Sequence, residues 1–320
     1  MNRIIMPTLT VLALGAVVLS GCSTSTTVSA PASTASTSAS SGTSAGQTTS
    51  STASGLGTGV TSFLADNVTS HAQPDDADYD PSTASRITLG SQDVLISEPG
   101  TYILSGTLTD ATITVNSTAE GKVRLVLDSV TLTSANGSPL VVTAADEVVL
   151  VLADGSTNTI TDTSAHLKSD DPDEPNAAIF SMADLTIAGT GTLRVTSNNA
   201  DAIASKDGLV VSSGTLALTA GDDGLRGKDY VIIEGGTIDV KSGGDAIKST
   251  NETDDTVGLV MINAGSVSLN AGDDAIHAEG DLVVAGGELT VTSSVEGLEG
   301  ANVVIAGGQT SIISSDDGLN

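Results

Sequence analysis

The chain has 320 residues, a formal net charge of −28 and 2% aromatic residues, with 35 glycines and no tryptophan. So few aromatics favour a narrow interior filled by small aliphatic side chains over an ordinary globular core. The acidic balance excludes nucleic acid as a partner, because the phosphates would be repelled, and it argues against adhesion to anionic lipid. It is compatible with divalent cations, which need oxygen ligands.

Residues 1–22 have the pattern of a lipoprotein signal peptide. Arg3 precedes an almost wholly apolar run, Ile4 to Leu19, which is short for a membrane span. The run ends in Leu19-Ser20-Gly21-Cys22, which resembles the lipobox of bacterial lipoproteins, and Cys22 is the only cysteine of the chain. We therefore expect lipidation of Cys22 and an extracytoplasmic protein that is anchored to the bacterial cell membrane through this N-terminal lipid only. The alternative is an incidental free thiol.

Residues 23–84 are expected to be a disordered tether and connector. Residues 23–62 are rich in Ser, Thr, Ala and Gly and cannot bury enough apolar surface to fold. The acids of the connector that follows are Asp75, Asp76, Asp78 and Asp80. The folded domain is predicted to span residues 85–320, with regular structure from about Arg86.

An internal repeat dominates the chain after residue 199. An acidic residue is followed two places on by an aliphatic one, and the acids are 22, 22, 29, 22 and 21 residues apart. The pairs are Asp201/Ile203, Asp223/Leu225, Asp245/Ile247, Asp274/Ile276, Glu296/Leu298 and Asp317/Leu319. Each unit also has a turn glycine, with aliphatic residues five and three places before it and mostly aliphatic residues two and four places after it. The turn glycines are Gly214, Gly236, Gly265, Gly287 and Gly308.

This pattern predicts an all-β fold, a right-handed parallel β-helix with coils of about 22 residues. Residues two apart lie on one face of a strand, and like residues at a constant coil length must stack about 4.8 Å apart. One coil cannot bury its inward face, but a stack can. Leucine-rich repeats need a signature that is missing here, and β-propeller repeats are about twice as long.

The C-terminal end is expected to be truncated or uncapped. The chain stops at Asp316-Asp317-Gly318-Leu319-Asn320, at the start of another coil. A bare end would be an unpaired strand edge. We therefore expect the sequence to be a fragment, or a partner to cover this end.

Residues 86 to 320 resemble the bacterial carbohydrate-binding β-helix domain family. The segments that carry the resemblance are Gly100 to Gly106, Asn158 to Asp162, Ala178-Ile179, Asp184 to Gly189, the Asp-Gly-Leu or Asp-Ala-Ile coils, and the acidic insertion before Gly258. The resemblance implies a pectate-lyase-like fold and a surface protein that binds polysaccharide, with cellulose and acidic sugars as ligands and with bound calcium.

The repeated acids form one column, and some coils add a second acid just before the first. Stacked carboxylates repel one another unless they are neutralised. Calcium favours several carboxylate oxygens, which makes a calcium cofactor our hypothesis for this column. The predicted metal ligands are Asp222, Asp223, Asp245, Asp273 and Asp274. The alternative is that these are solvated turn aspartates.

A second column, which we call the basic column after Arg226, Lys248 and His277, is expected on the outer face three residues after the acids, with two more lysines just beyond it. Its other members are Ala204, Glu299 and Asn320. The predicted ligand-binding residues are Lys206, Arg226, Lys228, Lys248 and His277. This stripe predicts binding of the carboxylates or hydroxyls of a sugar, with calcium bridging the same groups. The alternative is local neutralisation of the acidic column.

The sequence therefore predicts a surface protein that binds an acidic, polygalacturonate-like polysaccharide with calcium assistance. Tyr102 and Tyr230 are too few for an aromatic platform, which weakens the case for cellulose. No catalytic residue is predicted. Two alternatives stay open: a pectate-type lyase, for which Arg226 or Lys248 would be the base, and a structural surface adhesin or spacer.

Overall fold

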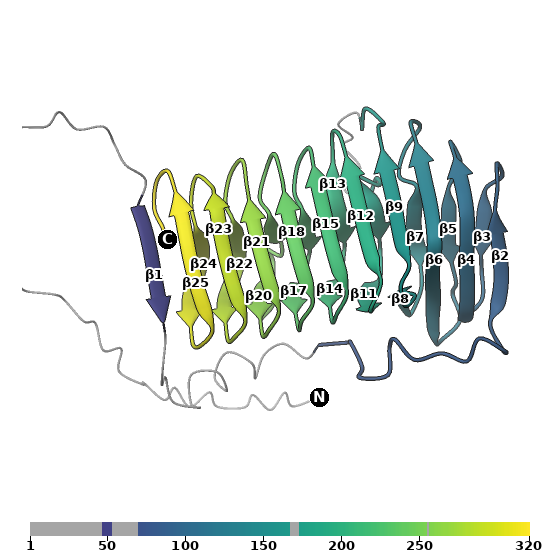
Figure 1. The fold of residues 1–320 in the computed structure, drawn as a ribbon, viewed down its shortest axis with the longest axis horizontal. Coiled ribbons are helices and arrows are strands. Elements are labelled where there is room, and N and C mark those ends of the chain that lie inside the picture. Colours follow the sequence, from purple (N-terminus) through teal and green to yellow (C-terminus); the bar gives the residue numbers. More distant parts are fainter. Residues whose placement is uncertain (1–46, 53–69, 167–172, 255) are drawn as a thin grey trace, which may run out of the picture. The chain divides into compact units, whose positions relative to one another are not determined.

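Every regular element of the described chain is a β-strand. The computed structural model describes residues 47–52, 70–166, 173–254 and 256–320 (Figure 1). Its 25 strands are joined in one hydrogen-bonded sheet, and in this part of the chain all pairings are parallel except that of β1 with β25. These observations confirm the all-β class and a parallel β-solenoid.

The N-terminal predictions fall outside this part of the chain. Residues 1–22, with the predicted lipidation site Cys22, are not among the described residues. Within the described ranges, the structure has no helix of the length and apolar character that a membrane span requires.

Each coil contributes strands to three faces, which we name A, B and C. Face A consists of β3 (Val94–Ile96), β5 (Ile113–Asn116), β7 (Leu140–Ala144), β10 (Ala177–Ser181), β13 (Asp201–Ser205), β16 (Leu225–Gly227), β19 (Ile247–Ser249) and the first parts of β22 (Ile276–Val284) and β24 (Leu298–Ile305).

Face B follows face A along each coil. It consists of β2 (Ser85–Leu89), the first parts of β4 (Gly100–Thr109) and β6 (Lys122–Ser134), β8 (Glu147–Leu152), β11 (Asp184–Gly189), β14 (Gly208–Val211), β17 (Tyr230–Ile233), β20 (Leu259–Ile262) and the second parts of β22 and β24.

Face C completes the coil. It consists of the second parts of β4 and β6, then β9 (Thr157–Asp162), β12 (Thr192–Ser197), β15 (Thr215–Ala220), β18 (Thr237–Lys241), β21 (Ser266–Asn270), β23 (Glu288–Ser293) and β25 (Gln309–Ser314). Figure 1 shows the strands of the three faces stacked in chain order from β2 to β25, with β1 beyond β25.

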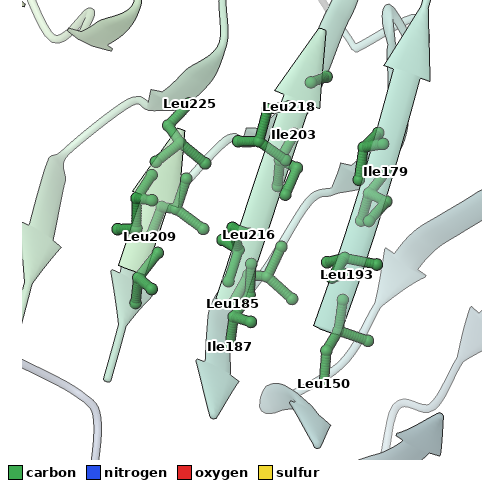
Figure 2. Packing of buried hydrophobic residues seen from close by; sticks show 14 of the residues in the cluster. Leu150, Ile179, Leu185, Ile187, Leu193, Ile203, Leu209, Leu216, Leu218 and Leu225 are labelled. Carbon is green, nitrogen blue, oxygen red and sulfur yellow. The ribbon is translucent and has the colours of Figure 1, made fainter. Parts of the chain in front are cut away.

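The core is a set of aliphatic columns between the faces. On face A, Ile203 pairs in register with Leu225, and Leu225 with Ile247, and all three side chains are fully buried. Aliphatic side chains from the three faces meet in the interior (Figure 2). Equivalent positions of successive coils stack on one another, so the inward-facing aliphatic columns predicted from the sequence form the hydrophobic core.

The turn glycines are required by the stacking. Gly236 has φ +91°, and a Cβ there would lie 2.7 Å from the carbonyl oxygen of Gly214 in the preceding coil. A side chain at this position would strain the backbone and push the two coils apart.

Residues 70–84 correct the prediction of a disordered connector. This segment, which we call the strap, is the dark blue segment before β2 in Figure 1. At one end, the Nδ1 atom of His71 lies 2.7 Å from the Tyr230 hydroxyl and 3.0 Å from Asp184 Oδ1, and its Nε2 lies 2.9 Å from Thr186 Oγ1. Gly208 leaves room for this arrangement, because a Cβ there would lie 2.3 Å from the Tyr230 ring.

The rest of the strap is held by a buried ion pair and apolar contacts. Asp76 is 1% exposed and pairs with Lys122, whose ammonium also lies 3.0 Å from Glu147. The apolar residues of the strap, Ala77, Tyr79 and Ala84, pack on the outer side chains Ile103, Val126, Val149, Val151 and Ala188 of face B. The strap therefore folds although it contains no periodic pattern.

A second correction concerns the tether. Strand β1 (Gln47–Thr52) lies within the segment expected to lack regular structure. It pairs antiparallel with β25, from Gln47 opposite Ser314 to Thr52 opposite Gln309. One edge of β25, on face C of the last coil, is thus paired with a strand of the same chain. The expectation of a truncated or uncapped C-terminal end stays a prediction.

Candidate functional site

The acidic column lies at the turn that leads into face A, and its first role is structural. The backbone N–H of Asp223 donates to Asp201 Oδ1 at 3.1 Å, and that of Asp245 donates to Asp223 Oδ1 at 2.9 Å. The N–H of Asp274 repeats the bond to Asp245 Oδ1 at 2.9 Å. These four aspartates are at most 8% exposed. An acid recurs here because one carboxylate oxygen satisfies a buried amide of the next coil, which would otherwise be unpaired.

The second oxygen of these carboxylates faces the basic column. Arg226 Nε lies 3.1 Å from Asp201 Oδ2, and Lys248 Nζ lies 2.6 Å from Asp245 Oδ2. His277 Nδ1 lies 3.3 Å from Asp274 Oδ2 and 3.1 Å from Glu299 Oε2. Three of the five predicted ligand-binding residues are thus engaged by acids, which is the arrangement expected from local neutralisation.

Burial makes this part of the column sensitive to protonation. Burial raises the pKa of Asp201 to about 7, although the charge of Arg226 opposes the shift. Burial likewise raises the pKa of Asp223 to about 6, against the hydrogen bond from the Asp245 amide. Burial alone would lower the pKa of Lys248, but its hydrogen bond to Asp245 raises it. The ammonium of Lys248 is therefore firmly charged, whereas Asp201 and Asp223 titrate near neutral pH.

Two lysines of the basic stripe form no ion pair with an acid of the described residues. Lys206 and Lys228 follow β13 and β16 at the turn between faces A and B, and their amides donate to Ser181 O and Ser205 O of the preceding coils. Within the described ranges, neither ammonium is in an ion pair. The Nζ atom of Lys206 lies 5.9 Å from the centroid of the buried Phe180 ring. Burial, and then the charge of Arg226, lower the pKa of Lys206.

Four of the five predicted metal ligands come together with other donors in groups that fit a metal ion. The groups are Asp201/Asp222/Asp223, Asp245/Asp274/His277 and Asp274/Glu296/Glu299, with donor atoms within 4.8 Å of one another in each. Asp273 belongs to none of these groups among the described residues. In the first two groups Arg226 or Lys248 already pairs with a carboxylate, so a cation would have to compete with it.

The third group, like the first, consists of three carboxylates, the ligand type that calcium prefers. No lysine or arginine of the described chain pairs with the third group, but His277 lies against Asp274 and Glu299, so an ion there would compete with the imidazole. Glu296 and Glu299 were not predicted as ligands. The signal was present in the sequence, because Glu296 continues the acidic column and Glu299 places an acid in the column that also contains Arg226 and Lys248.

Comparisons with known proteins agree with the fold and point to carbohydrate. A family profile described as carbohydrate-binding domain-containing protein matches residues 90–320. A curated relative from Acetivibrio thermocellus with the same description is 35% identical over 135 residues, which are 42% of this chain and 47% of the relative. The chain thus matches about half the length of that relative.

A solved structure extends the similarity over more of the chain. The polysaccharide lyase-like protein from C. thermocellum, solved as a gadolinium derivative, aligns with 74% of this chain and 95% of its own, at 29% identity and a TM-score of 0.59. The similarity therefore covers nearly all of that neighbour and most of the solenoid described above.

Proposed function

Since this chain belongs to the carbohydrate-binding domain-containing family, we propose that it is a cell-surface lipoprotein that binds an acidic, polygalacturonate-like polysaccharide. The observation that supports an acidic ligand is the pair of lysines Lys206 and Lys228. Among the described residues neither lysine forms an ion pair, although the charges of Asp173 and Asp201 act on Lys206, in a chain of net charge −28. Such cations attract carboxylates.

Retention on polysaccharide tests this proposal. The soluble domain is passed over immobilised polygalacturonate and over cellulose in the presence of calcium. Retention on polygalacturonate that is weakened in a Lys206→Ala/Lys228→Ala variant is the expected result. Lys241→Ala removes an exposed lysine on face C and serves as the matched control. Equal retention of the double variant and the wild type would contradict the acidic-ligand proposal.

Calcium assistance is the second part of the proposal. We assign one ion to Asp274, Glu296 and Glu299, and we keep the predicted ligands Asp222, Asp223, Asp245 and Asp273 as a further set. A cation at the third group would neutralise stacked carboxylates and could bridge to the acids of a polysaccharide. Melting of the protein with and without a chelator tests this assignment.

A lyase is the alternative that one observation favours. Arg226 and Lys248 form ion pairs with carboxylates. Lys206 forms none with the described residues, and burial lowers its pKa although the charges of Asp173 and Asp201 oppose the shift. A base needs a pKa close to the working pH. Incubation with polygalacturonate and calcium separates the candidates. Absorbance from unsaturated sugar ends indicates a lyase, retention without cleavage indicates a binder, and neither indicates a structural spacer.

Location and coil geometry complete the proposal. Lipidation of Cys22 would hold the protein outside the cytoplasm on the bacterial cell membrane, and release of a Cys22→Ala variant from the membrane fraction tests it. We also propose right-handed winding and a usual coil length of about 22 residues, supported by the spacing of Asp201, Asp223 and Asp245.

A further inference from the structure

A buried ion pair lies where face C passes into face A. Strand β9 ends at Asp162 and is followed by residues 163–166, whereas residues 173–176 lead into β10. Asp162 pairs with the Nε2 atom of His166, and the two side chains are 0% and 9% exposed. The N–H of Ser164 donates to the other carboxylate oxygen, Oδ1, at 2.8 Å. The pair therefore belongs to the interior of this corner, although its histidine lies in a turn.

His166 connects two segments of the chain. The backbone carbonyl of Pro175 accepts a second hydrogen bond from the imidazole. Both partners of the ring are acceptors, because the Asp162 carboxylate is ionised and proline has no N–H. Two acceptors need two ring N–H groups, and only the imidazolium form has both. Loss of the proton therefore breaks one of the two bonds.

We propose that Asp162 and His166 form a pH-sensitive clasp that fastens residues 173–176 to the end of β9. The clasp is closed while His166 is an imidazolium and Asp162 is a carboxylate. When His166 loses its proton, the buried carboxylate loses the cation with which it pairs among the described residues. Uncompensated buried charge is costly, so the neutral form of the clasp holds the segment more loosely.

Acidic groups surround the imidazole. Asp162 lies on β9, and the charge of Asp201, at the start of β13, also acts on the ring. Asp201 is itself paired with Arg226, which offsets part of its charge. The segment held by the clasp carries Asp173 and Glu174, and the end of β12 that pairs with Asp162 is uncharged. Negative surroundings favour the protonated ring.

The two pKa shifts define the pH range of the clasp. The hydrogen bond to Asp162 raises the pKa of His166 above 6.5, against the effect of burial. Burial alone would raise the pKa of Asp162, but its hydrogen bonds to His166 and Ser164 lower it below 3.8. The raised histidine stabilises the clasp fully below pH 6.5, and this contribution is lost as the pH rises through the pKa of His166. The clasp is therefore closed at mildly acid pH and opens at alkaline pH.

The backbone around the clasp is fixed by other contacts. His166 has φ +41°, in the left-handed region that residues other than glycine rarely adopt, and such strain persists where surrounding contacts impose it. Asn199 Nδ2 donates to Ser164 O at 2.8 Å, and the Asp201 N–H donates to Asn176 O at 3.1 Å. Asn176 Nδ2 also lies 3.4 Å from Asp201 Oδ2, so titration of Asp201 is the competing cause of a pH effect here.

Opening of the clasp would change the surroundings of Lys206. Burial lowers the pKa of Lys206, and the charge of Asp173 opposes this shift. The clasp thus keeps an acid near a lysine that we propose to bind polysaccharide, and a polyuronate would compete with that acid. This consequence rests on the proposed function, whereas the clasp itself does not.

Titration of the histidine rings in the full chain tests the ion pair. The chain has three histidines, His71, His166 and His277, so the resonance that is lost in His166→Gln identifies this residue. We expect the ring of His166 to titrate above pH 6.5 in the wild type and at a lower pH in Asp162→Asn. Arg194→Gln removes an exposed cation from β12 and should leave the titration unchanged. A wild-type titration at or below pH 6.5 overturns the proposal, and so does an unchanged titration in Asp162→Asn.

Hydrogen exchange tests whether the pair fastens the segment. Protection of the amides of residues 173–176, corrected for the intrinsic effect of pH, should fall several-fold between about pH 6 and about pH 8.5 in the wild type. The fall should remain in Asp201→Asn, which removes the competing titration, and vanish in His166→Gln, whose amide does not titrate. A wild type without this fall, or a fall that vanishes in Asp201→Asn, overturns the proposal. These two proteins decide the test even if His166→Gln does not fold.

Discussion

Asp245 accepts the backbone N–H of Asp274, 29 residues further along the chain, at 2.9 Å from its Oδ1 atom. Its other oxygen binds the ammonium of Lys248 at 2.6 Å. One carboxylate thus ties two coils together and neutralises a lysine of its own coil.

Asp245→Ala should therefore destabilise the solenoid. A buried amide that loses its acceptor costs about 1–3 kcal/mol, so we expect a clearly lower melting temperature with a chelator present. Asp239→Ala removes an exposed acid from face C and should change stability by no more than about 0.5 kcal/mol. Equal melting of the two variants would mean that the hydrogen bond between the coils contributes nothing.

Ile247→Asp tests the core register. Ile247 is fully buried between Leu225 and Ile276 of the neighbouring coils, so the new carboxylate would have no partner. We expect a loss of several kcal/mol, far above an ordinary surface change. Thermal melting followed by circular dichroism measures it. A variant that melts like the wild type would show that this column does not lie in the core.

Stability should fall as the pH rises from about 4 to about 7. The folded-state pKa is about 7 for Asp201 and about 6 for Asp223, against 3.8 for a free aspartate. Between these values the folded state binds more protons than the unfolded state, so unfolding becomes easier as the pH rises. The contribution of these acids is complete below pH 4 and is lost above about pH 7.

Asp201→Asn isolates the largest part of this effect. The amide oxygen can still accept the Asp223 N–H, but the side chain no longer titrates. Melting temperatures between pH 4 and pH 8 should therefore decline less in this variant than in the wild type, and Asp239→Asn should decline as the wild type does. A wild-type melting temperature that increases from pH 5 to pH 7 would contradict the assignment.

Calcium should stabilise the folded state by mass action. A chelator is expected to lower the melting temperature, and calcium should restore it better than magnesium, which demands near-ideal octahedral geometry. Glu296→Gln/Glu299→Gln should abolish the response if the third acidic group holds the ion. A response that survives in this variant but is lost in Asp222→Asn/Asp223→Asn would move the ion to the first group. No response in the wild type would remove calcium from the proposal.

The periodic part of this structure could be predicted from the sequence, because equivalent positions in successive coils need the same type of residue. The inward position of Ile203 recurs at Leu225 and Ile247, and the turn glycines such as Gly236 all take positive φ values. Few folds other than a solenoid can bury a repeat of aliphatic residues that are spaced as in β-strands. The acidic column was visible in the same way, and its position at the start of face A followed.

The strap could not be predicted, because its contacts occur once. His71 meets Tyr230 across 159 residues, and Asp76 meets Lys122 across 46. No periodicity links these residues, and an acidic, proline-containing segment after a low-complexity tether is typical of a linker.

The partners of the basic column could not be predicted for a related reason. The sequence places Arg226 and Asp201 on one side of the solenoid, but only the register shows that their side chains meet across two coils.

The two pairs of cations, Arg226 and Lys248 on face A and Lys206 and Lys228 at the turn that follows it, should respond differently to removal. Lys206→Ala/Lys228→Ala deletes charges that no acid of the described chain holds, so polygalacturonate retention should weaken while the melting temperature stays close to that of the wild type. Arg226→Ala/Lys248→Ala instead leaves the buried carboxylates of Asp201 and Asp245 without their partners. Uncompensated buried charge is strongly destabilising, so this second variant should melt at a clearly lower temperature.

Retention and melting are measured on both variants at the same pH and calcium concentration. If the Lys206/Lys228 variant keeps full retention and the Arg226/Lys248 variant loses retention without a change in melting, the ion pairs are dispensable and the basic column itself holds the polysaccharide.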